Sequence, residues 1–283
     1  MMEEITFTKM HGIGNDYIYI DCLGEVPTRL PDLAREMSDR HCGVGGDGII
    51  LILPSDKADF RMRIFNADGS EARMCGNGSR CVGKFLYDKG YAASTRITLE
   101  TLAGIRTLEL HIDGNEVSSV TVDMGAPETD PVLIPVVSSS PSMVEEPVMT
   151  SRGEIRITAI SMGNPHGVAF FNDLSAVDFD SIGPELEKHP MWPDRANIEF
   201  AEIVGNDEIR MRVWERGSGE TMACGTGACA TAVAAAITGR TGRRVKVHLT
   251  GGDLDIDWDA LTGRVRMTGP ATTVFEGRYI RRS

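Results

Sequence analysis

The chain has 283 residues, 41% hydrophobic and 25% charged, which suits roughly two globular domains and excludes a disordered or fibrous protein. Its 41 acidic against 29 basic residues give a net charge of −12, which disfavours nucleic acid or an anionic membrane as the main partner. The acidic start and the lack of any apolar run near about 18 residues argue against a signal peptide or spanning helix, so we expect a cytoplasmic protein.

The first half of the chain predicts strands before its first clear helix. Gly43, Gly45 and Gly48 formally match a dinucleotide-binding fingerprint, but the apolar run 49–53 that follows predicts a strand where that fingerprint needs a helix. Residues 61–65 alternate polar and apolar side chains, which is typical of a half-buried strand. We therefore predict sheet structure here and no dinucleotide site.

A turn that begins at Cys75 leads into the first predicted helix. Apolar residues recur at helical spacing from Cys81 to Leu86, and Gly90 is a plausible C-terminal cap. The Pro- and Ser-rich stretch 127–147 then predicts a connector with an exposed loop.

The second half predicts the same succession of elements. An alanine-rich helix follows the turn that begins at Cys224 and ends before Gly239. Its alanine side chains, from Ala228 to Ala236, are small enough for strands to surround the helix closely. We therefore expect a mostly antiparallel, mixed sheet wrapped around one central helix.

The two halves are copies of one domain. At an offset of 149 residues, 59–65 aligns with 208–214 and both segments contain Arg-Met-Arg. The same offset brings Gly14-Asn15 onto Gly163-Asn164, Glu71 onto Glu220, and Cys75 onto Cys224; beyond the Cys-Gly turn it slips to 148. This period is too long for a solenoid and predicts two pseudosymmetric domains of the α+β class. We expect the arginines Arg61, Arg63, Arg210 and Arg212 to form a solvated strand face or cross-strand pairs.

Two of the six cysteines have a setting that suggests chemistry. Cys75 and Cys224 each precede Gly-x-Gly at a predicted helix start, whereas Cys22, Cys42, Cys81 and Cys229 fit an inert role. The free N–H groups and partial positive charge of a helix start, worth roughly 0.3–1 kcal/mol, should bring a thiol pKa from roughly 8.5 towards 7. The same N–H groups can bind a carboxylate. Two such thiols could take a proton from one face of a carbon and return one to the other.

Several segments closely resemble those of the diaminopimelate epimerase family. They are Lys9–Tyr17, Phe65–Glu71, Met74–Cys81, Met162–His166, Glu215–Gly217 and Ala223–Ala230. The resemblance covers essentially the whole chain. It implies interconversion of LL-2,6-diaminopimelate and its meso form, in lysine and peptidoglycan precursor synthesis, by two bases without pyridoxal phosphate, another cofactor or a metal.

The resemblance also implies the domain limits and the site. A C-terminal strand would return to the first domain, giving domains at 1–125 with 271–283 and at 126–270. Cys75 would be the acid and Cys224 the thiolate base on LL substrate, with the roles exchanged in reverse. The residues implied to bind the amino-acid substrate are Asn15, Asn66, Gly76, Asn77, Asn164, Asn197, Glu215, Arg216, Gly225 and Thr226, while His166 and Glu215 would adjust the cysteine pKa values.

Two positions depart from the family pattern. Many members have Gln where this chain has Gly48, so water or neighbouring main chain would have to replace that substrate contact. Phe275 stands where some members have a tyrosine at the subunit contact, which leaves a homodimer open.

Three other functions remain alternatives. A racemase of another amino acid, such as a proline or hydroxyproline enzyme, would leave Arg216 without a distal carboxylate to bind. A thiol redox protein would cycle Cys75 and Cys224 between dithiol and disulfide. A non-catalytic binding protein would not need two thiols at mirrored positions.

Overall fold

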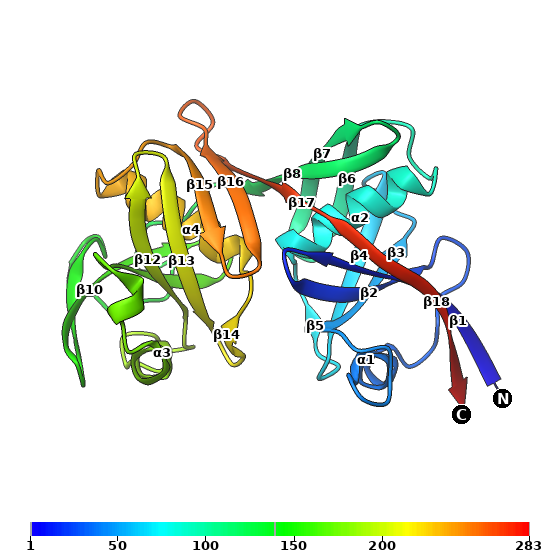
Figure 1. Ribbon diagram of the computed structural model, residues 1–283, viewed down its shortest axis with the longest axis horizontal. Helices are drawn as coiled ribbons and strands as arrows, with labels where there is room; N and C mark the ends of the chain where they lie inside the picture. The colour runs from blue at the N-terminus through cyan, green and yellow to red at the C-terminus, as the bar shows by residue number, and fades with distance from the viewer. Residues whose placement is uncertain (1, 139, 283) are drawn as a thin grey trace. The chain divides into compact units, whose positions relative to one another are not determined.

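The computed structural model describes residues 2–138 and 140–282, and the chain divides into two compact units (Figure 1). Unit 1 contains the residues up to Val122 and those from Thr268 onwards, whereas unit 2 is the continuous segment Asp123–Met267. The chain crosses from one unit to the other twice. The domain limits expected from the sequence stay a prediction, because compactness alone does not show which segments fold as domains.

Unit 1 is a mixed sheet in which most neighbouring strands are antiparallel. The pairs β1–β2, β1–β18, β3–β4, β4–β5, β6–β7 and β7–β8 are antiparallel, and the pairs β2–β3 and β4–β6 are parallel. Its elements are β1 (Met2–Gly12), β2 (Asn15–Asp21), α1 (Leu30–Ser38), β3 (Gly48–Leu53), β4 (Phe60–Asn66), β5 (Glu71–Ala72), α2 (Gly76–Asp88), β6 (Arg96–Thr101), β7 (Gly104–Asp113), β8 (Glu116–Gly125) and β18 (Thr272–Arg282).

Unit 2 repeats this pattern of pairs. The pairs β9–β10, β10–β11, β12–β13, β13–β14 and β15–β16 are antiparallel, and the pairs β11–β12 and β13–β15 are parallel. Its elements are β9 (Glu146–Thr150), β10 (Gly153–Ser161), β11 (Pro165–Phe170), the short 3-10 helix η1 (Leu174–Ala176), α3 (Phe179–Glu187), β12 (Asn197–Gly205), β13 (Glu208–Glu215), β14 (Gly219–Thr221), α4 (Gly225–Ile237), β15 (Arg244–Leu249), β16 (Gly252–Trp258) and β17 (Val265–Pro270).

The sequence repeat is a structural repeat. The helices α2 and α4 begin and end 149 residues apart, and so do α1 and α3, which the sequence analysis did not single out. An ion pair repeats as well: the Arg63 Nε atom lies 2.7 Å from a Glu71 oxygen, and the Arg212 Nε atom lies 2.9 Å from a Glu220 oxygen. Of the four arginines, Arg63 and Arg212 thus form the expected cross-strand pairs, and the two pseudosymmetric α+β halves are confirmed.

Each unit surrounds its central helix with strands, as the alanine-rich surface predicted. Every residue of α2 from Gly76 to Leu86 is buried, and α4 is buried from Gly227 to Ala235. The strands β10, β11, β12, β13, β15 and β16 all contact α4. Both helices end where the glycines predicted, because Gly90 and Gly239 adopt positive φ angles of 77° and 70° just after them.

The connector 127–147 has exposed positions, as expected, and buried ones as well. Val132, Leu133 and Val137 are exposed, but Ile134 and Met143 are buried in the apolar core of unit 2. The composition rich in Pro and Ser indicated an irregular backbone correctly. The composition did not indicate that some apolar side chains of this segment would be buried in the core of unit 2.

The last strand returns to unit 1, as the resemblance implied. β18 pairs with β1 along almost its whole length. The Arg281 side chain, only 7% exposed, donates to both carboxylate oxygens of Glu36 on α1, at 2.9 and 3.1 Å, and to the Thr28 carbonyl at 2.8 Å. The C-terminal strand is thus fixed to the sheet and to α1.

The packing around α4 leads to a prediction about stability. Ala230 is fully buried among strands, so replacing it with leucine should destabilise the protein by about 1–3 kcal/mol through overpacking. Urea unfolding of A230L against the wild type measures this loss. The matched change A236L, at a half-buried position near the end of the helix, should cost clearly less. Equal stability of A230L and the wild type would contradict close packing of strands around this helix.

Candidate functional site

Cys75 and Cys224 are the N-cap residues of the two central helices. Both have extended backbone angles, and each sulfur accepts a hydrogen bond from the third N–H of its helix. The distances are 3.2 Å from Gly78 N to Cys75 Sγ and 3.4 Å from Gly227 N to Cys224 Sγ. Capping by the sulfur fixes each thiol at the positive end of a helix, as the Cys-Gly turns predicted.

In unit 1 the Cys75 thiol lies beside two predicted binding residues. Its S–H group donates to Asn15 Oδ1 at 3.3 Å, and Asn77 Nδ2 donates to the same oxygen at 3.4 Å. The Asn15 Nδ2 group donates in turn to Asp47 at 2.7 Å. Arg80, fully buried in α2, donates to Asn77 Oδ1 at 2.9 Å. The structure therefore brings Cys75, Asn15 and Asn77 together. The hydrogen bonds to Asp47 and from Arg80 fix the orientation of the two amides.

Asp47 belongs to a charged cluster that supports this half of the site. Its carboxylate accepts from Asn15 and from the Asp16 backbone N–H, and it lies 3.0 Å from Arg40. Burial, aided by the charge of Asp16, raises the pKa of the Asp47 carboxyl. Burial also acts to raise the pKa of Asp16, but hydrogen bonds from Arg40 and Lys9 outweigh it, so that pKa is lowered.

Asn66 and Gly48 lie side by side at the ends of their strands. The register of β3 with β4 places Gly48 opposite Asn66. A Cβ atom on Gly48 would lie 2.2 Å from the Phe65 carbonyl oxygen and 2.9 Å from the Tyr17 ring, so this backbone leaves no room for a larger side chain such as glutamine. Asn66 Nδ2 donates to Ser70 Oγ at 3.1 Å, which holds its amide in the turn after β4.

In unit 2 the Cys224 thiol is buried among groups that oppose its ionisation. Burial, followed by the negative charges of Glu215 and Glu199, raises the pKa of Cys224 well above its ordinary value. Hydrogen bonds from the Thr226 hydroxyl and the Gly227 N–H act in the opposite direction. The expectation that the helix start lowers this pKa is therefore wrong for Cys224 in this structure, because burial and the two carboxylates outweigh the hydrogen bonds from the first turn of the helix.

Asn197 and Arg216 occupy one strand end of unit 2. Asn197 Oδ1 accepts from the Arg216 backbone N–H at 3.0 Å, and Asn197 Nδ2 donates to the Pro165 carbonyl at 3.2 Å. The Arg216 side chain is exposed and touches the Asp194 carbonyl. Neighbouring Glu215 accepts from the Thr221 hydroxyl. This end therefore presents an exposed guanidinium next to a half-buried carboxylate.

Asn164 and His166 form a second group in unit 2. His166 is fully buried, with its Nε2 atom 3.1 Å from Asn164 Oδ1 and its Nδ1 atom 2.7 Å from Glu199 Oε1. Glu199 is also fully buried and was not among the predicted site residues.

The sequence contained weak signals for the residues that were missed. Glu199 is an acidic residue within an otherwise apolar run, 198–201, and it aligns with Ile50 at the 149-residue offset. Asp47 precedes Gly48 in a glycine-rich segment and looked like an ordinary turn residue. Both became recognisable only when the fold showed which side chains they contact.

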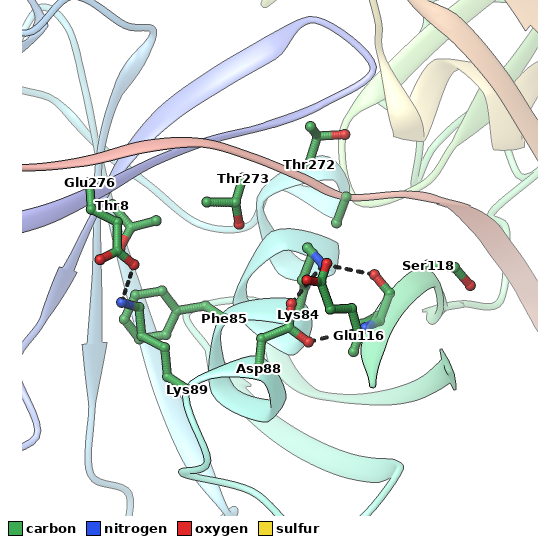
Figure 2. Close-up of a pocket in the computed structure, with 12 residues that line it drawn as sticks. Thr8, Lys84, Phe85, Asp88, Lys89, Glu116, Ser118, Thr272, Thr273 and Glu276 are labelled. Carbon is green, nitrogen blue, oxygen red and sulfur yellow. Dashed lines mark hydrogen bonds and ion pairs between the residues drawn. The ribbon is translucent and has the colours of Figure 1, made fainter. Parts of the chain in front are cut away.

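A cavity of about 480 Å³ lies in unit 1 beside the second half of α2, away from these residues. Figure 2 shows its cations with acidic partners: Lys84 lies 2.6 Å from Asp88 and 3.5 Å from Glu116, and Lys89 pairs with Glu276. None of the predicted site residues lines this cavity. Both lysines of the lining are paired with carboxylates of the same lining, so neither is available to an anionic ligand.

Within residues 2–138 and 140–282, no group of three or more His, Cys, Asp and Glu side chains could hold a metal ion. Over the same ranges, no helix has the length and apolar character needed to cross a membrane.

The surroundings of Cys224 predict opposite effects for two substitutions. Glu215→Gln removes a negative charge, so the pKa of Cys224 should fall and more thiolate should be present at pH 8. Thr226→Val removes a hydrogen bond that favours the thiolate, so the pKa should rise. The rate of Cys224 alkylation by iodoacetamide, followed by mass spectrometry across pH, should increase several-fold in the first variant and decrease in the second. Changes in the same direction would refute this electrostatic account.

Comparisons with known proteins identify the family and the fold of the chain. A family model described as diaminopimelate epimerase matches residues 7–129 and 158–274. Among solved structures, a PhzF-family phenazine biosynthesis protein from Bacillus anthracis has a TM-score of 0.71 at 18% identity, covering 98% of this chain and 99% of its own. A hydroxyproline epimerase from Agrobacterium vitis, solved with trans-4-hydroxy-L-proline, also has a TM-score of 0.71, at 17% identity and with 98% and 91% covered. These two share the fold.

Curated relatives match far more closely in sequence. A diaminopimelate epimerase of Bacteroides thetaiotaomicron is 53% identical over 279 residues, which cover 98% of both chains. One from Acetivibrio thermocellus is 50% identical over 271 residues, which cover 96% of this chain and 97% of its own. Since identity of this level extends over nearly the whole length, the chain belongs to the diaminopimelate epimerase family, whose members are amino-acid epimerases and hence isomerases.

Proposed function

We propose that this protein interconverts LL-2,6-diaminopimelate and meso-diaminopimelate with Cys75 and Cys224 as its two bases. The observation that carries the proposal is the repeated N-cap, which places one thiol per unit on the free N–H groups of a buried helix start. The names of the curated relatives support the substrate. The reaction would serve lysine and peptidoglycan precursor synthesis.

The proposed chemistry is a proton exchange that needs two sulfur atoms at one carbon. The Cys224 thiolate takes the α-proton and becomes a thiol, which leaves a carbanion next to the substrate carboxylate. The Cys75 thiol then gives its proton to the opposite face and becomes a thiolate. The N–H groups of Gly76, Asn77, Gly225 and Thr226 are suited to hold a carboxylate, which favours the negative charge that develops there. No pyridoxal phosphate or metal takes part in this scheme.

The raised pKa of Cys224 fits this chemistry if the substrate itself promotes ionisation. Glu215 is one of the two charges that oppose the Cys224 thiolate. An ammonium group of the substrate beside Glu215 would neutralise that charge and lower the pKa of the thiol. The base would then form mainly when the substrate is bound.

The remaining predicted residues are assigned to binding. Asn15, Asn66, Asn164 and Asn197 offer amides to the ammonium and carboxylate groups of the substrate. The exposed Arg216 guanidinium is suited to a bidentate hold on the distal carboxylate.

A homodimer also remains a proposal. Val274, Phe275 and Ile280 on β18 are 46–53% exposed, and the Phe275 ring packs edge-on against Phe7. These apolar side chains would suit contact with a second copy, and sedimentation velocity of the full chain tests this.

Replacing either cysteine tests the two-base scheme directly. C75A and C224A should each lower kcat by about 10²–10⁴-fold or more, because each removes a proton-transferring group. Proton NMR with LL-diaminopimelate in deuterated water follows both the epimerisation and the entry of deuterium at one stereocentre. The exposed Cys42 provides the control, since C42A should keep the wild-type rate. Undiminished turnover in both C75A and C224A would refute the scheme.

Arg216 separates diaminopimelate from substrates without a distal carboxylate. Arg216→Met should raise KM for diaminopimelate by roughly tenfold or more, since a charge-assisted bidentate contact is lost. Proline supplied to the wild-type protein in the same NMR assay should show no deuterium exchange. Efficient exchange of proline, together with an unchanged KM in R216M, would favour the racemase alternative instead.

A further inference from the structure

Four side chains of unit 1 form a continuous network of hydrogen bonds beside the Cys75 sulfur. Arg80 Nη1 donates to Asn77 Oδ1 at 2.9 Å, and Asn77 Nδ2 donates to Asn15 Oδ1 at 3.4 Å. The Cys75 S–H group donates to the same Asn15 oxygen at 3.3 Å, and Asn15 Nδ2 donates to Asp47 Oδ2 at 2.7 Å. The network thus joins α2 to the start of β2 and to the residue that precedes β3.

Both oxygens of the Asp47 carboxylate accept hydrogen bonds from groups that can only donate. Its Oδ2 atom accepts from the Asp16 backbone N–H at 3.0 Å, and its Oδ1 atom accepts from Arg40 at 3.0 Å. Neither a backbone N–H nor a guanidinium has an acceptor atom, so the carboxylate acts as an acceptor at each oxygen. The Asn15 atom that contacts this carboxylate at 2.7 Å is therefore the amide nitrogen.

The other end of the network fixes the same orientation. Arg80 is fully buried and its guanidinium can only donate, so the Asn77 atom that faces it is the amide oxygen. The Asn77 NH₂ group then faces Asn15. Turning the Asn15 amide over would bring its oxygen against the Asp47 carboxylate and its NH₂ group against that of Asn77. The chemistry of both ends therefore directs the Asn15 oxygen towards Cys75.

Unit 2 keeps its N-cap cysteine without such a network. The strands β3 and β12 begin 149 residues apart, as the helices α2 and α4 do, so equivalent positions can be compared directly. The positions equivalent to Asn15, Asp47, Asn77 and Arg80 hold Asn164, Ala196, Thr226 and Cys229. Ala196 and Cys229 are fully buried, and neither can replace a carboxylate or a guanidinium. A sulfur cap at a buried helix start therefore forms without these charged groups, and packing alone does not explain their presence in unit 1.

The orientation of Asn15 determines which form of the Cys75 sulfur is favoured. An amide oxygen has no proton to give, so its contact with the sulfur is a hydrogen bond only while Cys75 carries its proton. Such a bond opposes ionisation, whereas the Gly78 N–H group that donates to the sulfur favours it. If the Asn15 amide turned over, its NH₂ group would donate to the sulfur as well, and both neighbours would favour the thiolate.

We propose that Asp47 is a positioning residue, which holds the Asn15 amide with its oxygen facing Cys75 so that this thiol keeps its proton for the substrate carbon. The inference rests on the proposed function for the role of Cys75 as an acid. Asp47 acts through Asn15 in this scheme and not on the substrate itself. Tyr19, a further ionisable group near this thiol, is neutral at physiological pH because burial raises its pKa well above the ordinary value.

The experiment compares Asp47→Ala with Asp47→Asn in the full-length protein. Alanine, the residue at the equivalent position of unit 2, removes the acceptor of the Asn15 NH₂ group. Asparagine removes the same charge but keeps an oxygen for Asn15, because Arg40, whose side chain is 56% exposed, is able to turn to solvent. A positioning role therefore predicts loss in D47A and retention in D47N, whereas a role of the charge predicts loss in both.

The first readout is the pair of Asn15 side-chain NH₂ signals in ¹⁵N–¹H NMR spectra, identified by their absence in N15A. It requires no turnover. In the wild type the proton bonded to the carboxylate should be shifted downfield, and this shift should largely persist in D47N and be lost in D47A. Arg40→Gln is the control, since it removes the other side-chain partner of Asp47 and should leave the Asn15 proton downfield.

The second readout is the rate at which iodoacetamide alkylates Cys75 at pH 8, followed on its peptide by mass spectrometry. D47A should raise this rate several-fold, because a released Asn15 amide no longer opposes the thiolate. D47N should react at close to the wild-type rate. In an N15A background D47A should raise the rate no further, because the amide through which it acts is gone.

Epimerisation of LL-diaminopimelate provides the third readout. D47A should lower kcat by about tenfold, the effect of one misplaced hydrogen bond, and should change KM less. D47N should recover most of the rate.

Each outcome decides one part of the inference. Equal behaviour of D47N and D47A, or alkylation effects of D47A and N15A that simply add, would overturn the positioning role. If the wild type does not epimerise diaminopimelate at all, the proposed function fails, while the NMR and alkylation results still decide whether Asp47 directs Asn15 towards Cys75. Should D47A not fold, Asp47→Ser replaces it with the same expected results, since the serine hydroxyl lies one bond closer to the backbone and does not reach the Asn15 NH₂ group.

Discussion

The hydrogen bond from the third N–H group of each central helix to the sulfur of its N-cap cysteine is the constraint on which both halves depend. The N–H donors belong to Gly78 and Gly227, where a Cβ atom would lie 2.7 Å from Ile50 Cδ1 and 2.6 Å from Glu199 Oε1, so both positions require glycine. Because the first turn is buried, strands must enclose the helix and supply the remaining contacts. The sheet, the Cys-Gly turn and the position of the thiol therefore depend on one another, and the same combination is found in both units.

Duplication preserved this scaffold while the two thiols acquired different surroundings. Cys75 is half-buried and donates to the side-chain oxygen of Asn15, whose amide is held by Asp47 of the charged cluster. Cys224 is buried beside two carboxylates, which oppose the loss of its proton. The two thiols therefore differ in burial and in the charges around them, although their helix starts are alike.

Much of this architecture could be predicted from the sequence because the signals were local or repeated. The 149-residue offset, the alternating strand 61–65 and the glycine caps each depend on a few neighbouring residues, and the fold agreed with them. Contacts between distant segments could not be predicted from the sequence. The contact of Glu199 with His166, for example, depends on a parallel pairing of β11 with β12 that no sequence pattern indicated. The pKa of Cys224 was misjudged for the same reason, since the helix start was visible in the sequence and the burial was not.

The path of the chain has a consequence for how the protein is made. Unit 2 consists of one continuous segment, so all of its strands are available before the last residues are synthesised. The first part of unit 1 precedes unit 2 in the chain and leaves the ribosome before it. Strand β1, which pairs with β2 on one side, nevertheless lacks its second neighbour until β18, which follows unit 2, has been released. The N-terminal part of unit 1 therefore keeps one open sheet edge until unit 2 has been synthesised. Unit 1 completes its sheet after unit 2, although it precedes unit 2 in the chain, which is the reverse of the usual order of co-translational folding.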